Sequence, residues 1–371
     1  MEPVDVLVVL GTRPEVIKLA PLVHALRRQG LAAGILATAQ HRSLLDQMLA
    51  AFDLHPDWDL DSMRPDQKLG ELVGRILPEL ERLIPASGCR LVLAQGDTTT
   101  VFAAALAAFH ARVPFGHVEA GLRSGDLDAP FPEEGNRRLA SVLARFHFAP
   151  TETARAALLA EGVPADRIHV VGNTVIDALL DMAARPGLPW PAQLAPLEPG
   201  RRLVLVTLHR RENFGAPLQR CFGALAAFAR AHPDAVLVYP VHPNPNVAGP
   251  ARAALDGLAN VHLLEPVDYP QMVALLRSAW AVVTDSGGLQ EEAPALGKPV
   301  LVCREVTERP EAVAAGSVKL AGTDGATLLA LAQELWDDPA AYAAMAVPRF
   351  PFGDGRASGR IAEILARWLR P

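Results

Sequence analysis

Two acidic side chains, Glu119 and Glu133, have the placement expected of a proton-transfer site. Glu119 directly follows a strand-like run at 113–118, and Glu133 follows a proline at the start of a predicted helix. Acids at a strand end and at a helix start can converge on one cleft, where paired carboxylates are suited to move protons. Two structural explanations stay open: Glu133, like its neighbour Glu134, suits any helix N-terminus, and Glu119 could pair with an arginine such as Arg123.

Further charged residues follow other predicted strands of the first half. Arg13 follows the first strand, Lys18 lies in the next helix, and Asp97 follows the third strand. Because the carboxyl ends of parallel strands share one sheet edge, Arg13 and Asp97 are expected near Glu119. The basic pair could face an anion at a helix N-terminus. The alternatives are solvated charges in an ordinary turn, and Asp97 or Thr98 as a helix cap.

A small-residue turn in the second half predicts a phosphate site. Ser286, Gly287 and Gly288 lie between a predicted strand and a helix. Backbone N–H groups in such a turn can approach a diphosphate at the helix start, and Glu292 could accept hydrogen bonds from ribose hydroxyls. An ordinary glycine-rich turn is the alternative.

Basic side chains also follow strands of the second half. His209 and Arg210 follow its first strand, His242 the second, and Arg309 a later one. A histidine beside an arginine can bind phosphate and handle a proton near neutral pH. The alternatives are a basic surface turn for His209 and a structural role for His242.

Composition limits the class of protein. The chain has 371 residues, 50% of them hydrophobic and 20% charged, which is typical of a soluble globular protein of about two domains. The net charge of −6 argues against a broad nucleic-acid surface. Three distant cysteines suggest neither a disulfide framework nor a zinc site. We see no signal peptide or membrane span, and the cytoplasm is the expected location.

Short apolar runs alternate with amphipathic segments along the whole chain. This alternation predicts two α/β domains with doubly wound parallel sheets and helices on both faces. The predicted strands are 5–10, 33–38, 90–94, 113–118, 146–149, 167–171, 203–207, 235–240, 260–264, 280–284, 299–303 and 316–320. The principal predicted helices are 14–29, 66–84, 98–110, 151–161, 216–231, 268–278, 324–336 and about 357–370.

Domain limits follow from the linker at 185–200, which holds five prolines and two glycines. We predict a first domain at 1–184 that carries the carboxylates, and a second at 185–355 that carries the diphosphate site. The last segment, 356–371, is predicted to be a helix that can pack on the first domain.

These motifs together resemble the non-hydrolysing UDP-N-acetylglucosamine 2-epimerases over essentially the whole chain. The resemblance implies a GT-B-like fold of two Rossmann-like domains, with the active site in the interdomain cleft, and a homodimer. It implies no cofactor and no essential metal. The segments that carry it are Gly11-Thr-Arg-Pro-Glu-Val-Ile-Lys18, Gln40-His41-Arg42, Gly96-Asp-Thr-Thr-Thr100, His117-Val-Glu-Ala-Gly-Leu-Arg123, Pro132-Glu-Glu134, Gly172-Asn-Thr-Val-Ile-Asp177, His209-Arg-Arg-Glu212 and Asp285-Ser-Gly-Gly-Leu-Gln-Glu-Glu292.

The resemblance implies that UDP-N-acetylglucosamine and UDP-N-acetylmannosamine are interconverted. The family eliminates UDP in the anti sense to give 2-acetamidoglucal, and adds it back in the syn sense after the C2 proton returns on the other face. The implied catalytic residues are Asp97, Glu119, Glu133, His209 and Lys18. The implied substrate-binding residues are Arg13, Lys18, Asp97, Glu119, His209, Val267 and Met272 for uracil, Ser286, Gly287, Gly288, Glu292 and Arg309.

Many bacterial members are activated by a second UDP-N-acetylglucosamine. The matching positions are Gln40, Thr99, Glu133, Arg210 and His242. At the sixth position of this possible allosteric set, Ser43 stands where such members often have glutamine.

Other functions also fit the motifs. A GT-B glycosyltransferase would use the same UDP site with less need of three acids. A relative could epimerise a UDP-diacetamido sugar acid, and an inactive nucleotide-sugar sensor would need no intact acids. The partners expected are a UDP-sugar and a second copy of the chain, with no nucleic acid or membrane. The product could feed a bacterial surface polysaccharide.

Overall fold

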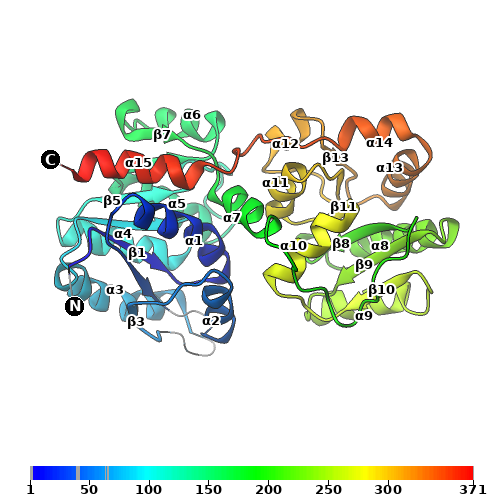
Figure 1. Cartoon of the computed structure of the whole chain (residues 1–371), viewed down its shortest axis with the longest axis horizontal. Coiled ribbons are helices and arrows are strands. Elements are labelled where there is room, and N and C mark those ends of the chain that lie inside the picture. Colours follow the sequence, from blue (N-terminus) through cyan, green and yellow to red (C-terminus); the bar gives the residue numbers. More distant parts are fainter. Residues whose placement is uncertain (1–2, 39–41, 63, 65–66, 371) are drawn as a thin grey trace. The chain divides into compact units, whose positions relative to one another are not determined.

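The structure is a computed structural model that describes residues 3–38, 42–62, 64 and 67–370. The chain divides into two compact units, each shown in Figure 1. The first unit comprises Met1–Leu180 and Phe352–Pro371, and the second comprises Asp181–Pro351. Among the helices of the described residues, none is long and apolar enough to cross a membrane.

The first unit is built on a seven-stranded parallel sheet in the order β3-β2-β1-β4-β5-β6-β7. Helix α1 packs against α2 and α15, and α4 packs against α3 and α5. The strands are β1 (Val6–Leu10), β2 (Ala33–Ala37), β3 (Trp58–Asp59), β4 (Leu91–Gln95), β5 (Phe115–Val118), β6 (Phe146–Ala149) and β7 (Ile168–Val170). The helices are α1 (Arg13–Arg28), α2 (Arg42–Ala51), α3 (Leu69–Ala86), α4 (Thr99–His110), α5 (Glu133–Leu143), α6 (Glu152–Ala160), α7 (Thr174–Ala183) and α15 (Ala357–Leu369), with a short 3₁₀ turn at Ala165–Arg167.

The second unit is built on a six-stranded parallel sheet in the order β10-β9-β8-β11-β12-β13. Helix α8 packs between α9 and α13. The strands are β8 (Arg202–Thr207), β9 (Ala235–Pro240), β10 (Val261–Leu264), β11 (Ala279–Thr284), β12 (Val300–Val302) and β13 (Val318–Leu320). The helices are α8 (Ala216–Ala231), α9 (Pro245–Leu255), α10 (Tyr269–Ser278), α11 (Gly287–Ala295), α12 (Pro310–Ala314), α13 (Gly325–Asp337) and α14 (Pro339–Met345), with a 3₁₀ turn at Arg211–Asn213.

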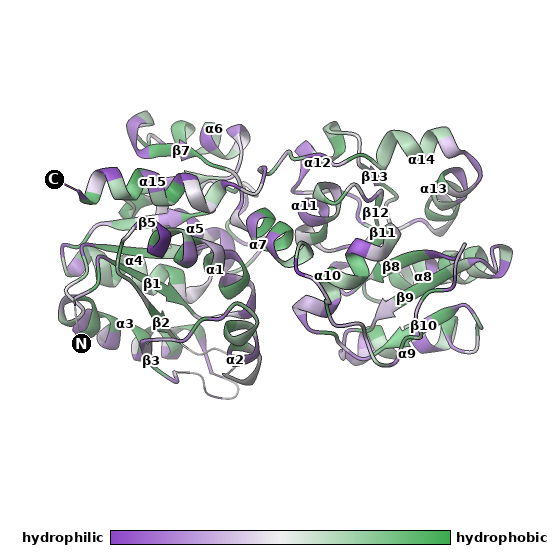
Figure 2. Cartoon of the chain, viewed as in Figure 1, coloured by the Kyte–Doolittle hydropathy of each residue, from purple (hydrophilic) through white to green (hydrophobic). Residues whose placement is uncertain are grey.

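Apolar runs explain why these strands form. Every residue of β1, β2, β4, β5 and β6 is buried, as strands covered on both faces require. Strands β1 and β2 are accordingly among the most apolar segments in Figure 2. The predicted two-sheet α/β organisation is confirmed, and every predicted strand is present. Strand β3 was not predicted, because two residues are too short to form an alternating pattern.

The chain passes from the first unit to the second within α7 and returns at Phe352. The division therefore falls after Leu180 and before Phe352, whereas residues 184 and 355 were expected to end the first two domains. The predicted linker at 185–200 lies inside the second unit.

The last helix, α15, belongs to the first unit. The Asp177 carboxylate accepts hydrogen bonds from the backbone N–H groups of Ala357 (3.2 Å) and Ser358 (2.7 Å), which start α15. At its far end, the Trp368 ring meets the Phe146 ring edge-on, with centroids 5.2 Å apart. The helix is thus fixed at both ends to elements of the first unit, namely α7 and β6.

Candidate active site

Glu119 is held from several sides at the carboxyl end of β5. Its carboxylate accepts hydrogen bonds from Lys18 Nζ (2.6 Å), from Asn173 Nδ2 (3.1 Å) and from the Gln95 side-chain amide. The residue is 7% exposed and has a φ of +63°, a left-handed conformation that costs a non-glycine residue about 1–3 kcal/mol. The pairing of Glu119 with Arg123, one of the explanations left open, is not seen: Arg123 forms a two-pronged salt bridge with Glu161 at 2.8 Å.

Asp97 follows β4 and is oriented by the first two turns of α5. Arg137 Nη2 lies 2.6 Å from Asp97 Oδ2, and Asn136 Nδ2 donates to the Asp97 backbone oxygen at 2.9 Å. The cap of α4 is Thr98, whose side chain accepts from the Val101 N–H at 3.3 Å. Asp97 is therefore not needed as the helix cap, which was the other interpretation of this residue.

The two neighbouring acids at the start of α5 differ in environment. Glu134 is fully buried and accepts from the Ser124 N–H and from Arg138 Nε, both at 3.0 Å. Burial alone would raise the pKa of Glu134, but these bonds and the Arg137 charge outweigh it and lower the pKa. Glu133 is half-buried and makes no ion pair with any described residue. Glu134 is therefore a structural anion, and Glu133 is the acid left available.

The turns after β1 and β4 are tied together by a buried glutamate. Glu15 accepts hydrogen bonds from the N–H groups of Gly11 (2.8 Å) and Thr12 (2.6 Å) and from Thr98 Oγ1 (2.7 Å). Burial raises the pKa of Glu15 despite these bonds. Arg13 is half-buried, begins α1 next to these hydrogen bonds, and makes no ion pair with the residues described. The turn after β1, which carries Arg13, and the turn after β4, which carries Asp97, are thus held together at one edge of the sheet.

A buried histidine forms a hydrogen bond with the backbone of the turn that carries Asp97. His117 Nε2 lies 2.7 Å from the backbone oxygen of Gly96 and donates to it. Burial lowers the pKa of His117 to about 4, and likewise that of His147 on the neighbouring strand. Both imidazoles are therefore neutral near pH 7.

In the second unit, Asp285 organises the turn after β8. This fully buried carboxylate accepts from the N–H groups of His209 (2.9 Å) and Arg210 (2.8 Å) and from Asn213 Nδ2 (3.1 Å). The His209 ring stacks on His242, with centroids 5.6 Å apart. Burial lowers the pKa of His209, with partial compensation by Asp285. The imidazole is thus mostly neutral at pH 7.

The start of α11 lies beside two guanidinium groups. A Cβ added at Gly287 would lie 3.5 Å from Arg210 Nη2 and 3.8 Å from Arg309 Nη2. Arg309 is itself held by the buried carboxylate of Glu291. Backbone N–H groups of a helix N-terminus flanked by two arginines make an anion site with room for a phosphate. The predicted turn at Ser286, Gly287 and Gly288 is the N-cap and first turn of this helix.

Glu292 lies on the first turns of α11. Its Oε1 accepts from the Tyr269 hydroxyl at 3.3 Å, and its Oε2 would lie 3.6 Å from a Cβ at Gly288. Burial and this carboxylate raise the pKa of Tyr269 far above its ordinary value. Val267 is buried just before α10, and Met272 is half-buried within it. The predicted ribose and uracil residues therefore lie on α11, on α10 and in the segment before α10.

The predicted allosteric residues are spread over both units. Thr99 is buried at the start of α4, His242 is exposed after β9, and Ser43 belongs to α2. Gln40 lies outside the described residues. In the second unit Arg210 and His242 both neighbour His209, through the chain and through ring stacking respectively.

Sequence reasoning missed three residues that orient the site, namely Gln95, Asn173 and Asp285. Each is buried and follows or ends a strand: β4, β7 and β11 respectively. That shared position was the available signal, because polar residues at strand ends are where α/β sites form.

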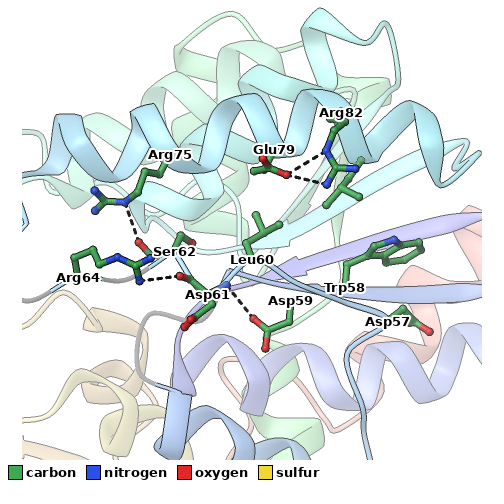
Figure 3. A pocket seen from close by; sticks show the side chains of 11 residues that line it. Asp57, Trp58, Asp59, Leu60, Asp61, Ser62, Arg64, Arg75, Glu79 and Arg82 are labelled. Carbon is green, nitrogen blue, oxygen red and sulfur yellow. Dashed lines mark hydrogen bonds and ion pairs between the residues drawn. The ribbon is translucent and has the colours of Figure 1, made fainter.

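A separate cavity of about 540 Å³ lies beside edge strand β3 (Figure 3). It is lined by the segment from Asp57 to Ser62, by Arg64 and by α3, and several of its polar groups bond to one another. Arg82 Nη2 pairs with Glu79 at 2.8 Å, and Arg75 Nε donates to the Ser62 backbone oxygen at 3.1 Å. None of the predicted site residues lines this cavity. Within the described residues no cluster of His, Cys, Asp and Glu is suited to hold a metal ion.

Comparison with known proteins agrees with this geometry. The model of the UDP-N-acetylglucosamine 2-epimerase family matches residues 24–366. The UDP-N-acetylglucosamine 2-epimerase of Yersinia pestis is 50% identical over 369 residues, which cover 97% of this chain and 98% of that protein. A crystal structure of the Neisseria meningitidis UDP-GlcNAc 2-epimerase bound to UDP-GlcNAc superposes with a TM-score of 0.88 at 42% identity, and covers 98% of this chain and 100% of that chain.

The fold extends beyond this family. The structure of the glycotransferase of kitacinnamycin gives a TM-score of 0.67 at 16% identity over 100% of both chains, which shows a shared fold alone. The expected GT-B-like pair of Rossmann-like units is thereby confirmed. The family match and the full-length identities show that this chain belongs to the UDP-N-acetylglucosamine 2-epimerase family.

Proposed function

We propose that this protein interconverts UDP-N-acetylglucosamine and UDP-N-acetylmannosamine by inverting C2 of the sugar. The family membership and the UDP-GlcNAc bound to the Neisseria relative support this substrate. The observation that carries the proposal is the buried carboxylate of Glu119, held by Lys18, Gln95 and Asn173 at a sheet edge that also carries Asp97 and Glu133.

The proposed reaction removes and returns one proton at C2. A carboxylate takes the C2 proton, the electron pair of the C–H bond forms the C1–C2 double bond, and the C1–O bond breaks to release UDP. The enzyme-bound product is 2-acetamidoglucal. A proton is then added to the opposite face of C2 while UDP adds back at C1. Elimination is anti and addition is syn, so acids are needed on both faces of the sugar.

The three first-unit acids suit this requirement because their surroundings differ. Glu119 is enclosed by donors, Asp97 is paired with Arg137, and Glu133 has no ion pair with a described residue. We propose that these three carboxylates, with Lys18, serve the two proton transfers, and that Arg13 contributes positive charge to the same edge. A glycosyltransferase would not need most of these carboxylates for its reaction.

The second unit is proposed to hold UDP. The N–H groups at Ser286, Gly287 and Gly288, with Arg210 and Arg309 beside them, would stabilise the charge that develops on the departing diphosphate. His209 would assist that departure.

We propose that the nucleoside is held by α10 and α11. Glu292 would accept from the ribose hydroxyls, and Val267 and Met272 would flank uracil. Glu133, Thr99, Arg210 and His242 remain candidates for a second, activating UDP-sugar.

We further propose a homodimer in the cytoplasm. Phe109 on α4 and Val142 on α5 are large apolar side chains that are 61% and 82% exposed, and α4 packs against α5, so this face is suited to a second copy. The three cysteines are buried free thiols, as a reducing compartment favours. The product would supply amino sugar for a bacterial surface polysaccharide.

The deciding experiment incubates the purified protein with UDP-N-acetylglucosamine in D2O. We expect deuterium at C2 in a mixture of UDP-linked gluco and manno sugars, measured by NMR. Free N-acetylmannosamine without its UDP-linked form would indicate a hydrolysing enzyme. Absence of C2 exchange would contradict the epimerase proposal, and transfer of the sugar to an added acceptor would favour a glycosyltransferase.

A further inference from the structure

We propose that Asn173 is a positioning residue for Glu119, and that the segment Phe352–Gly353, where the chain returns to the first unit, sets the place of Asn173. This inference rests on the proposed function, because it concerns the carboxylate expected to serve the C2 proton transfers. It adds a residue and a chain segment to which the resemblance assigned no role.

Asn173 is held by hydrogen bonds of its backbone N–H and of both ends of its side-chain amide, and the amide N–H group donates to Glu119. It is 2% exposed, and its Nδ2 donates to Glu119 Oε1 at 3.1 Å. Its own Oδ1 accepts from the Val175 N–H at 3.2 Å, which fixes which end of the amide faces the glutamate. Glu119 Oε2 is taken by Lys18 and Gln95, so Asn173 supplies the bond to the other oxygen. Together the two sides determine the plane of the carboxylate.

The returning segment lies directly against Asn173. The Asn173 N–H donates to the Phe352 backbone oxygen at 2.6 Å. Gly172, at a φ of +97°, and Gly353, at +118°, pack backbone to backbone. A Cβ added at Gly172 would lie 2.9 Å from Gly353 Cα, and one added at Gly353 would lie 3.1 Å from the Asn173 nitrogen. Two glycines are required here because neither backbone could approach so closely with a side chain.

Both connections between the units therefore begin beside one residue. Helix α7 leaves from Thr174, immediately after Asn173, and the return reaches Asn173 through Phe352. Asp177 of α7 also accepts from the first N–H groups of α15, which ties the outgoing and returning segments together. A displacement of either segment is transmitted through one amide to the orientation of Glu119.

Asn173→Asp tests the hydrogen bond to Glu119. The aspartate keeps the size and the Oδ1 bond to Val175, but it places an acceptor against Glu119 where a donor stood. Two facing carboxylates share a proton as the pH falls, and a protonated aspartate again donates. We expect kcat for C2 exchange to fall about 10- to 100-fold at about pH 8, with KM changed less than about twofold. The ratio of variant to unaltered rate should rise as the pH is lowered.

Asn260→Asp is the matched control. Asn260 in the second unit donates to the backbone oxygens of Ala229, His232 and Ala235, and it has no contact with Glu119. This variant can lose stability, but its rate per folded molecule should follow the pH profile of the unaltered protein. An Asn173→Asp profile parallel to that of Asn260→Asp would overturn the inference.

Gly353→Ala tests the returning segment. The added Cβ would lie 3.1 Å from the Asn173 nitrogen, and alanine is disfavoured at the φ of this position. We therefore expect kcat to fall about tenfold with little change in KM. Gly359→Ala, six residues later in α15, adds a Cβ with nothing within 4 Å and should leave kcat unchanged. Equal kcat in the two variants would contradict the part assigned to Phe352–Gly353.

The two levels of proposal fail in different ways. No C2 exchange by the unaltered protein overturns the proposed function and this inference with it. Normal exchange by the unaltered protein, with Asn173→Asp active at every pH, overturns this inference alone.

Discussion

The two sheet edges of this protein share one plan and present different charged groups. In each unit a strand ends in a tight turn and a helix follows, with buried acids behind the turn. In the first unit Glu15 and Glu134 are tied to backbone and arginines, and further carboxylates remain at the edge. In the second unit, Asp285 and Glu291 hold His209, Arg210 and Arg309. The groups at this edge are therefore arginine side chains and the backbone N–H groups at the start of α11.

This difference shows how one architecture serves two tasks. The buried acid is common to both edges, and the groups that it holds in place decide what the edge presents. Carboxylates suit proton transfer at carbon, whereas arginines and a helix N-terminus suit a diphosphate. If this division holds, changes at the first edge should alter turnover, and changes at the second should alter nucleotide affinity.

The largest expected effect is that of Glu119→Gln. Glutamine keeps the shape of the side chain and removes its ability to accept a proton, so C2 exchange should fall by about 1,000-fold or more. The Kd for UDP, measured by calorimetry, should stay within about twofold. A near-normal rate of exchange would remove Glu119 from the catalytic set. A large loss of UDP affinity would break the division between the edges.

The second effect concerns stability in acid, which should be concentrated in the first unit. Burial lowers the pKa of His117 and of His147 to about 4, below the value near 6.5 of an unfolded chain. The unfolded state therefore binds more protons between these values. The stabilisation from each neutral histidine is complete above about pH 6.5 and declines by about 3 kcal/mol as the pH falls to 4.

Hydrogen exchange at about pH 7 and pH 4.5 would measure this effect separately in each unit. We expect β5 and β6 to lose protection first at the lower pH, and His147→Phe to reduce the difference. Equal loss of protection in the two sheets would contradict the prediction.

The third prediction tests the anion site of the second unit. Gly287→Ala places a methyl group 3.5 Å from Arg210 Nη2 and 3.8 Å from Arg309 Nη2, in the space proposed for the diphosphate. Stability should be unchanged or higher, because alanine favours helix. The Kd for UDP should rise about tenfold. Gly223→Ala in α8, where the added Cβ meets nothing within 4 Å, should leave Kd unchanged. Equal UDP affinity in both variants would indicate that the diphosphate binds elsewhere.

The smallest expected effect is the pH dependence of substrate binding through His209. Burial lowers its pKa, so the imidazolium forms only below about pH 6.5, where it attracts a diphosphate. In a Glu119→Gln background, affinity for UDP-N-acetylglucosamine should rise about threefold once the pH is low enough to protonate His209, and the rise should begin only below about pH 6.5. His209→Asn should abolish this slope. A slope that survives the substitution would assign it to another group.

Much of the fold could be predicted from the sequence because strands buried on both faces are continuous apolar runs. Helix α9 was harder to predict, since Pro250 lies inside it. Strand β3 has two residues and is defined by its pairing with β2, which no local pattern contains.

The candidate site divides in the same way. Residues at strand ends, such as Asp97, Glu119 and Ser286, could be found from the order of strands and turns. Contacts between distant segments could not: the pairing of Lys18 with Glu119 spans 101 positions, and that of Arg123 with Glu161 spans 38. Asn173 follows a strand, but its contact with Phe352 depends on where the chain returns to the first unit, which is a property of the tertiary structure.

The placement of α15 has a consequence for how the chain folds as it is synthesised. The second unit is one continuous stretch, Asp181–Pro351, and can complete its sheet and helices as soon as that stretch has emerged from the ribosome. The first unit has residues on both sides of this stretch, so it lacks α15 until the second unit has been synthesised. In chains truncated after residue 351 and released from the ribosome, proteases should therefore find the second unit folded and the first unit, which lacks α15, open to cleavage.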